Sequence, residues 1–155
     1  MRVYRLSRKK YTNALSGKGA SQSNNRWNSK GTEVIYTAES RALALAEVAV
    51  HLSFATLPSD FVMMEIEISD DCHIAILDTS SLSKDWNAFP SPLSTMKLGD
   101  KFIESKSALA LKVPSAVVAG DFNYLINPHH PDLNKIGLIN ISPFPIDGRL
   151  FKIDL

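Results

Sequence analysis

The most informative segment of the chain reads Asn24-Asn25-Arg26-Trp27-Asn28-Ser29-Lys30-Gly31, then Val34-Ile35-Tyr36-Thr37-Ala38-Glu39-Ser40, then Ala42-Leu43-Ala44-Leu45-Ala46-Glu47. It places Arg26, Tyr36 and Glu47 at the edges of short apolar elements. A loop of small residues with Gly17 and Gly19 lies just upstream and offers exposed backbone N–H groups, which suit an anion. Together, a fixed cation, backbone donors and an anion suit a ligand that carries a diphosphate and becomes positively charged at its reacting end.

The hydrophobic pattern around this segment predicts two helices. The Ala- and Leu-rich run over residues 38–52 lacks Gly and Pro and is apolar on most sides, so we expect a buried helix with Thr37 as its N-cap. A second helix is expected at Leu93–Ser105, interrupted by Gly99.

Alternation with a period of two identifies the strands. Between Phe61 and Ile68, apolar residues face one side while Glu65 and Glu67 face the other, which predicts a half-buried strand. Further short strands are expected at residues 3–6, 26–28, 34–36, 73–77, 109–113, 116–118, 124–126 and 136–141. These elements predict the α+β class, with a single compact domain over residues 1–155, a mostly antiparallel central sheet and flanking helices.

Composition and charge exclude several classes of function. A chain of 155 residues favours one domain, and its net charge of +1 argues against a general nucleic-acid binder, because such binding rests on many phosphate contacts. The basic residues within 2–10 are read as a solvated face. The single cysteine, Cys72, allows no intrachain disulfide, and no residue set matches a zinc site, so no metal is expected. Without an apolar run of ~20 residues or a signal-peptide pattern, the chain is expected to be cytoplasmic and free of membrane contact.

Four residues are candidates for chemistry, and each has an ordinary structural alternative. Glu47 is an edge carboxylate, an ion-pair partner of Arg26, or a functional anion, because a carboxylate on an apolar helix face is costly to bury unpaired. Arg26 stacks on Trp27 or binds a phosphate or carboxylate with two donors. Tyr36 is a core tyrosine or a site residue, and Ser115 is a turn residue or a site residue. The residues alone therefore indicate an Arg–Tyr–Glu cluster and go no further.

The sequence resembles the RES-domain toxins of bacterial toxin–antitoxin pairs. The arginine, glutamate and serine that name that family match Arg26, Glu47 and Ser115. Further matches lie in residues 17–20, 122–128 and 144–150, so the resemblance covers almost the whole chain. The chain departs from the family pattern at Asn24-Asn25, where glycines are usual, and at Gly148, where proline is frequent.

The resemblance implies a fold like that of ADP-ribosyltransferases and an enzyme that consumes NAD+ as substrate, without a prosthetic group. It implies cleavage of the nicotinamide–ribose bond by hydrolysis, phosphorolysis or transfer, with an oxocarbenium-like ribose as in glycoside cleavage. The catalytic residues implied are Arg26, Tyr36, Glu47 and Ser115. Further ligand contacts, of lower rank, are expected from Arg5, Trp27, Asn28 and Asn127.

The main hypothesis is a toxin that degrades NAD+ and arrests growth, and the alternative is a protein ADP-ribosyltransferase with a specific target. A non-catalytic module and a nucleic-acid-directed toxin are disfavoured by the intact cluster and by the near-neutral charge. The resemblance also implies a helical, DNA-binding antitoxin of the Xre type whose C-terminal end enters the site. This antitoxin, rather than the present chain, would contact nucleic acid, and a dimer or a larger toxin–antitoxin assembly is expected.

Overall fold

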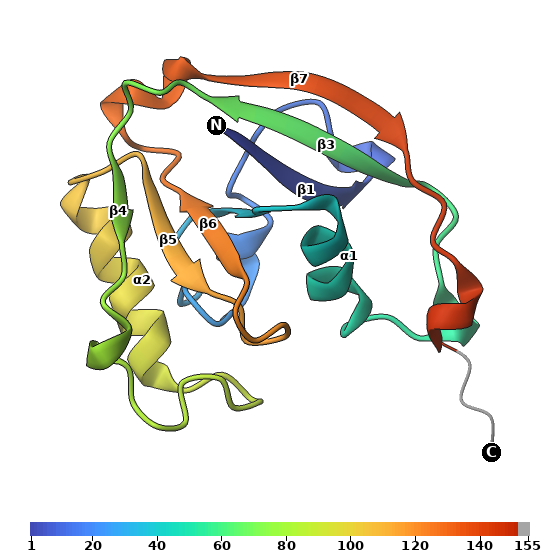
Figure 1. Ribbon diagram of the computed structural model, residues 1–155, viewed down its shortest axis with the longest axis horizontal. Coiled ribbons are helices and arrows are strands. Elements are labelled where there is room, and N and C mark those ends of the chain that lie inside the picture. Colours follow the sequence, from blue (N-terminus) through green and yellow to red (C-terminus); the bar gives the residue numbers. More distant parts are fainter. Residues whose placement is uncertain (152–155) are drawn as a thin grey trace.

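The computed structural model describes residues 1–151, and in it seven strands form one sheet in the order β4-β5-β6-β2-β1-β3-β7 (Figure 1). The strands are β1 (Arg2–Arg8), β2 (Ile35–Ala38), β3 (Phe61–Ile68), β4 (Ile74–Ile76), β5 (Ala110–Pro114), β6 (Phe122–Ile126) and β7 (Ile136–Pro143). All neighbouring pairs are antiparallel except β4 and β5, which are parallel. The predicted α+β class and mostly antiparallel sheet are confirmed. The last four residues of the expected domain, 152–155, lie outside the described residues.

Within residues 1–151, two α-helices accompany the sheet, α1 (Arg41–Ala49) and α2 (Leu93–Ser105). Short 3-10 turns occupy Lys9–Tyr11, Ala20–Gln22, Phe54–Thr56, Thr79–Ser81, Pro131–Lys135 and Gly148–Phe151. In Figure 1, β1, β3 and β7 cross the top of the molecule, whereas β4, β5 and β6 stand upright beside α2. Helix α1 packs against β1 and β2, near the middle of the sheet. The change of direction along the sheet is the accumulated twist of its strands.

Two apolar clusters anchor the elements that matter for the site. Under α2, Trp27 is buried with Phe102 and Ile103 of the helix. Under α1, Leu43 is buried with Leu6 of β1 and other apolar residues of the sheet. The segment that holds Arg26 and the helix that holds Glu47 are therefore each fixed to the sheet by buried apolar side chains.

Helix α1 is shorter and less buried than predicted. Residues 35–38 pair with β6 as strand β2, where Thr37 Oγ1 donates to the Tyr124 carbonyl at 2.7 Å instead of capping a helix. The N-cap is Ser40, whose hydroxyl accepts from the Leu43 N–H at 3.0 Å. Within the helix, Leu43 and Ala44 are the buried residues. The prediction of a continuous helix over residues 38–52 was wrong: Ala38 pairs in the sheet, Ser40 caps the helix, and the helix ends at Ala49.

Two predicted strands are turns instead. Residues 25–28 form a tight turn closed by a hydrogen bond from the Asn25 N–H to the Asn28 carbonyl at 2.8 Å. Residues 116–118 form a bend in which Ser115 Oγ accepts from the N–H groups of Val117 and Val118 at 3.1 and 2.9 Å. In both places polar groups satisfy the backbone locally, so no neighbouring strand is needed.

The bounds predicted for Phe61–Ile68 and Leu93–Ser105 are confirmed, but two details differ. Strand β3 is covered on both faces rather than half-buried, and Glu65 is buried between Arg2 and Arg41, with N···O distances of 2.8 and 2.9 Å. Gly99 does not interrupt α2, because the helix runs through it without a break.

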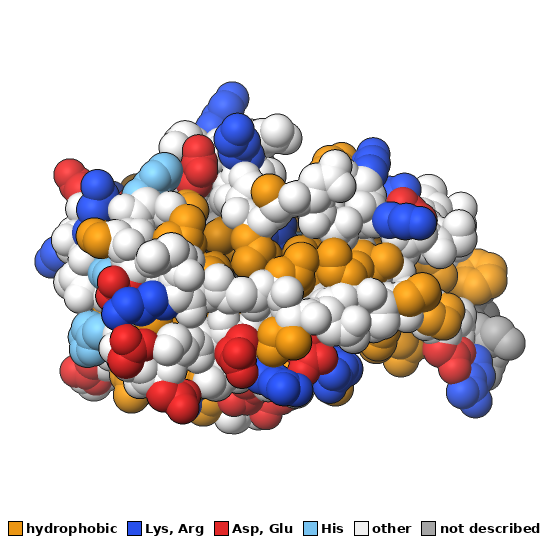
Figure 2. Space-filling model, turned by 90° about the horizontal axis from the view of Figure 1, so that it is seen from above, with side chains coloured by type: hydrophobic (Ala, Val, Ile, Leu, Met, Phe, Trp, Pro, Cys, Tyr) orange, Lys and Arg blue, Asp and Glu red, His pale blue; other side chains and the backbone are white. Residues whose placement is uncertain are grey.

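Strand β7 forms one edge of the sheet and carries no charged residue. Leu138, Ile139 and Ile141 on this strand are exposed, and Figure 2, which looks down on the side that is uppermost in Figure 1, shows a band of apolar side chains across this face. Among residues 1–151, neither helix has the length and apolar character that crossing a bilayer requires.

Candidate active site

A cavity of about 710 Å³ lies where the 25–28 turn, β2, the second half of α1 and the loop after Trp86 meet. Five of the eight residues predicted for the site line it, namely Arg5, Arg26, Trp27, Tyr36 and Glu47. They come from four separate elements, namely β1, the 25–28 turn, β2 and α1, so the tertiary fold assembles the cluster.

Arg26 holds the neighbouring loop. Its Nη1 donates to the carbonyl oxygens of Trp86 and Ala88 at 2.6 and 3.0 Å. Within the part of the chain that the structure describes, Arg26 forms neither an ion pair with Glu47 nor a cation–π contact with Trp27. Burial lowers the pKa of Arg26, while the nearby charge of Glu47 raises it. The carbonyl acceptors are neutral, so the guanidinium still presents a net positive charge to the cavity.

Glu47 is held by two side-chain donors. Its Oε1 accepts from Ser115 Oγ and from Asn123 Nδ2, each at 2.6 Å. Ser115 is only 4% exposed and does not line the cavity, and the Val117 and Val118 N–H groups orient its hydroxyl toward the carboxylate. Among residues 1–151, no hydrogen bond reaches Glu47 Oε2. The carboxylate is thus fixed by one oxygen while the other remains available.

Tyr36 faces the cavity, and its hydroxyl is hydrogen-bonded within the protein. The Tyr36 Oη donates to Asn28 Oδ1 at 2.7 Å and accepts from the Trp27 N–H at 3.2 Å. Burial raises the pKa of Tyr36, the bond from Trp27 lowers it, and the charge of Asp100 adds to the rise. The net effect is a phenol that stays protonated and ties β2 to the 25–28 turn.

Arg5 is a second cation on the cavity wall. Its Nη1 donates to the Ser16 carbonyl at 3.3 Å, and burial lowers its pKa. No carboxylate forms an ion pair with it in the described range. The wall therefore presents two arginines, neither of which has its charge cancelled by an acid.

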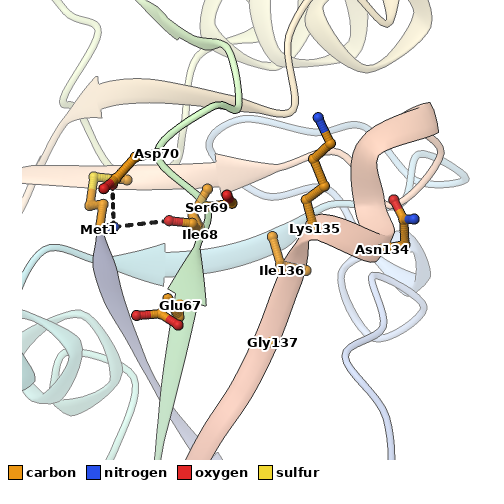
Figure 3. Close-up of a pocket in the computed structure, with 9 residues that line it drawn as sticks. All are labelled: Met1, Glu67, Ile68, Ser69, Asp70, Asn134, Lys135, Ile136 and Gly137. Atoms are coloured by element: carbon orange, nitrogen blue, oxygen red, sulfur yellow. Dashed lines mark hydrogen bonds and ion pairs between the residues drawn. The ribbon is translucent and has the colours of Figure 1, made fainter.

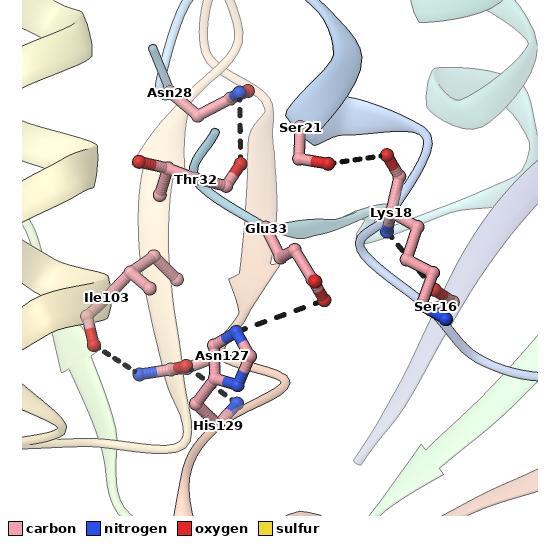
Figure 4. A network of polar contacts seen from close by, with 9 residues as sticks. All are labelled: Ser16, Lys18, Ser21, Asn28, Thr32, Glu33, Ile103, Asn127 and His129. Atoms are coloured by element: carbon pink, nitrogen blue, oxygen red, sulfur yellow. Dashed lines mark hydrogen bonds and ion pairs between the residues drawn. The ribbon is translucent and has the colours of Figure 1, made fainter. Parts of the chain in front are cut away.

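Asn28 and Asn127, both predicted as ligand contacts, lie outside the cavity wall and hold loops together (Figure 4). The fully buried Asn28 amide donates to the carbonyls of Ala20 and Thr32 at 2.9 and 3.2 Å. The buried Asn127 amide donates to the Ile103 carbonyl at 2.9 Å. Its side-chain oxygen accepts from a backbone N–H of the turn that follows. Their positions assign them to the scaffold around the site rather than to its surface.

Three features of the site were missed by sequence reasoning. Asn123 contacts Glu47, and His51 also lines the cavity. His51 follows Glu47 by four residues, a helical spacing that would have placed both on one side. The loop with Asn87 and Phe89 borders the cavity as well, and Phe89 is 84% exposed. No local pattern signalled this loop, because its contacts with Arg26 go to main-chain carbonyls.

A second cavity, of about 430 Å³, lies where β3 ends and β7 begins (Figure 3). There the N-terminal amine donates to the Ile68 carbonyl at 2.9 Å and to Asp70 at 3.1 Å. None of the predicted site residues lines it. Across residues 1–151, no group of three His, Cys, Asp or Glu side chains is arranged to hold a metal. The larger cavity is therefore the candidate active site.

Comparison with known proteins identifies the family of the chain. The profile of the RES domain matches residues 2–147. The chain is 39% identical over 154 residues to a protein named Toxin Res from Photorhabdus laumondii subsp. laumondii, with 98% of both chains covered. It is 34% identical over 140 residues to the Prs ADP-ribosylating toxin of Sphingobium sp., covering 89% of this chain and 87% of that protein.

One solved structure shows the same fold at low sequence identity. The crystal structure of the M. tuberculosis MbcT–MbcA toxin–antitoxin complex matches with a TM-score of 0.71 and 19% identity, over 97% of this chain and 86% of that chain. The domain match spans nearly the whole sequence, and the Photorhabdus relative shares more than a third of its residues with this chain. The chain therefore belongs to the RES-domain family of toxins.

Proposed function

We propose that this chain is the toxin of a toxin–antitoxin pair and an enzyme that cleaves the nicotinamide–ribose bond of NAD+, passing ADP-ribose to water or phosphate. The observation that carries the proposal is that Arg26, Tyr36 and Glu47 line one cavity, in which Glu47 is held by Ser115 and Asn123. In this proposal NAD+ is the substrate, no prosthetic group takes part, and the reaction takes place in the cytoplasm.

The charges in the cavity match the two ends of NAD+. Arg5 and Arg26 are cations without acidic ion-pair partners among residues 1–151, and they suit a diphosphate. An arginine has five N–H donors, so Arg26 keeps donors for phosphate oxygens while Nη1 holds the loop carbonyls. The cavity volume of about 710 Å³ lies within the usual range for small-molecule sites.

Glu47 suits the reacting end. Departure of nicotinamide leaves positive charge on the ribose, and a fixed carboxylate stabilises that charge without having to reorganise. Because Ser115 and Asn123 both bind Oε1, Oε2 is the oxygen that faces the ribose cation or orients the incoming water or phosphate. Tyr36 supplies a neutral aromatic wall against the nicotinamide or the ribose.

The second candidate function is transfer of ADP-ribose to a specific protein. The observation in its favour is the name of the Sphingobium relative, Prs ADP-ribosylating toxin. The same arginines and carboxylate would serve this reaction, since the bond that breaks is the same and only the acceptor differs.

The proposed partner is an antitoxin of the Xre type encoded beside this chain. The M. tuberculosis neighbour was solved as a toxin–antitoxin complex. Apolar side chains stand at the cavity rim, where Val50 is 57% exposed and Phe89 is almost fully exposed. A C-terminal antitoxin segment would cover these side chains and place its carboxylate near Arg26, in a dimeric or larger assembly that leaves DNA contact to the antitoxin.

One assay tests the proposal directly. Purified protein is incubated with NAD+, with and without inorganic phosphate, and the products are identified by mass spectrometry beside a Glu47→Gln control. We expect free nicotinamide together with ADP-ribose, or with its phosphate ester when phosphate is present. Absence of nicotinamide release from a folded parent protein would refute NAD+ cleavage. Release that requires added cell extract, with ADP-ribose found on one protein, would instead establish the second candidate function.

A further inference from the structure

Helix α2 touches the 25–28 turn through its backbone. A Cβ atom built on Gly99 would lie 1.6 Å from the Trp27 carbonyl oxygen and 2.5 Å from its carbonyl carbon. No side chain therefore fits between the helix and the turn. The absence of a side chain at Gly99 lets the next residue of the helix, Asp100, reach the chain just beyond the turn.

Asp100 binds that chain with both carboxylate oxygens. Its Oδ1 accepts from the Ser29 N–H at 3.0 Å, and its Oδ2 accepts from Ser29 Oγ. Hydrogen bonds to an ionised carboxylate are roughly twice as strong as those between neutral groups. The pair joins residues 71 positions apart, so it fixes the turn to α2 rather than to its own neighbours.

The segment that Asp100 holds leads directly into the candidate site. Ser29 follows Asn28, whose side-chain oxygen accepts from the Tyr36 hydroxyl at 2.7 Å. The Trp27 N–H donates to the same hydroxyl at 3.2 Å, and Arg26 stands at the tip of the turn. A shift of Ser29 would therefore move the Arg26 guanidinium and the Tyr36 hydroxyl together.

We propose that Asp100 is a positioning residue of the active site. By holding Ser29 it keeps the 25–28 turn in register, so that Arg26 faces the cavity and Tyr36 stays in place beside it. Asp100 does not line the cavity and acts through its neighbours. The expected effect of Asp100 on activity rests on the proposed function, whereas its stabilisation of the 25–28 turn can be measured without any substrate.

The activity test compares Asp100→Ala with Asp100→Asn. Asparagine keeps the size of the side chain, accepts from the Ser29 N–H and offers its amide to Ser29 Oγ, while alanine removes both bonds. We expect Asp100→Ala to lower kcat for NAD+ cleavage by about tenfold or more, since a displacement of order 1 Å at a supporting residue costs up to about 10²-fold. Asp100→Asn should recover most of that loss.

The matched control is Glu104→Ala, which removes a carboxylate from an exposed position of the same helix. It should leave kcat within about twofold of the parent, as surface substitutions usually do. Should Asp100→Ala lower the melting temperature but keep the parent's kcat in the folded protein, the residue is merely a structural contact and the proposal is overturned. Equal loss in Asp100→Ala and Glu104→Ala would also overturn it.

The substrate-free test is amide hydrogen exchange. In the parent and in Glu104→Ala, the Asn25 and Ser29 N–H groups should be protected, because each is hydrogen-bonded. In Asp100→Ala, exchange should accelerate at least about tenfold across residues 25–29 and stay unchanged in β3, as local opening predicts. If exchange across residues 25–29 is unchanged in Asp100→Ala, Asp100 does not stabilise the turn, even if the protein cleaves NAD+. If the parent does not cleave NAD+, the proposed function fails, and the exchange pattern still decides whether Asp100 positions the turn.

Discussion

Ser115 donates its hydroxyl hydrogen to Glu47 Oε1 across 2.6 Å, although 68 residues separate the two in the chain. The two residues that the resemblance matches to the glutamate and the serine of the family name are thus one unit, a carboxylate and the donor that orients it. Asn123 completes the unit from β6. This relationship makes the Glu47 environment testable residue by residue.

Replacement of Ser115 by Ala should reduce NAD+ turnover by about tenfold, the value of one hydrogen bond to a charged group. Asn123→Ala should do the same, and the double variant should lose more than either, because Glu47 Oε1 then has no donor among the described side chains. Steady-state kinetics should show the loss in kcat rather than KM. Ser115→Thr keeps a hydroxyl and should recover activity. If Ser115→Ala behaves as the parent does, Asn123 alone orients Glu47.

Glu47→Gln should abolish most turnover while the fold persists. The substitution keeps the size of the side chain and removes the negative charge opposite the developing ribose cation, so a loss of about 10²–10³-fold is expected. Nicotinamide release is the measurement, with circular dichroism to verify folding and Glu104→Gln as the control on an exposed surface. A folded Glu47→Gln protein with near-normal turnover would show that the carboxylate is structural.

Arg26→Lys should weaken NAD+ binding although the charge is kept. Lysine has no planar fork and cannot hold the Trp86 and Ala88 carbonyls while also presenting two donors to a diphosphate. Calorimetric titration in the Glu47→Gln background avoids consumption of NAD+, and Kd should rise by about tenfold or more, since a bidentate pair is lost. If Glu47→Gln and the double variant Glu47→Gln/Arg26→Lys bind NAD+ with equal Kd, Arg26 holds the loop and does not bind the ligand.

Tyr36 should produce a pH dependence of stability in the alkaline range. Its pKa is raised in the folded protein from the ordinary value of 10.0, chiefly by burial, so the folded state holds the phenolic proton more tightly than the unfolded state does. This contribution is complete below pH 10 and is lost as the pH rises toward the folded pKa. Urea denaturation from about pH 8 to about pH 11 should show a steeper fall in unfolding free energy for the parent than for Tyr36→Phe. Parallel curves would contradict the burial argument.

Expression of this chain alone should deplete cellular NAD+ and arrest growth, because a catalyst of this kind drains a shared cofactor pool. Co-expression of the neighbouring gene should yield a copurifying complex in which turnover is blocked. NAD+ levels and growth are measured with and without the neighbour, with Glu47→Gln as the inactive control. Growth arrest at unchanged NAD+ would point to protein modification instead. A stable complex with full activity would reject occlusion of the cavity, and lack of copurification would reject the partnership.

The local sequence pattern predicted secondary structure correctly where contacts with other segments do not change the conformation that the segment itself favours. The bounds of the strand Phe61–Ile68 and of the helix Leu93–Ser105 were predicted correctly, because periodicity and propensity act within each segment. The pattern failed at residues 26–28 and 116–118, where polar groups close a turn or a bend, and at the start of the predicted helix, where Ala38 pairs with β6 as the last residue of strand β2. Short segments carry too few repeats to outweigh such contacts.

Residue types and hydrophobic patterning were enough to predict the α+β class, the resemblance to the RES-domain family, and the candidates Arg26, Tyr36 and Glu47. The contacts that each of these residues makes depend on the folded arrangement of distant segments. The bonds from Arg26 to Trp86, from Asn123 to Glu47 and from Ser29 to Asp100 join residues 60, 76 and 71 positions apart. Hydrogen bonds depend on distance and angle after the chain has folded, and no periodicity in the sequence records them. The residue types therefore pointed to a candidate site, while the geometry of that site was set by the packing of α1 and α2 against one twisted sheet.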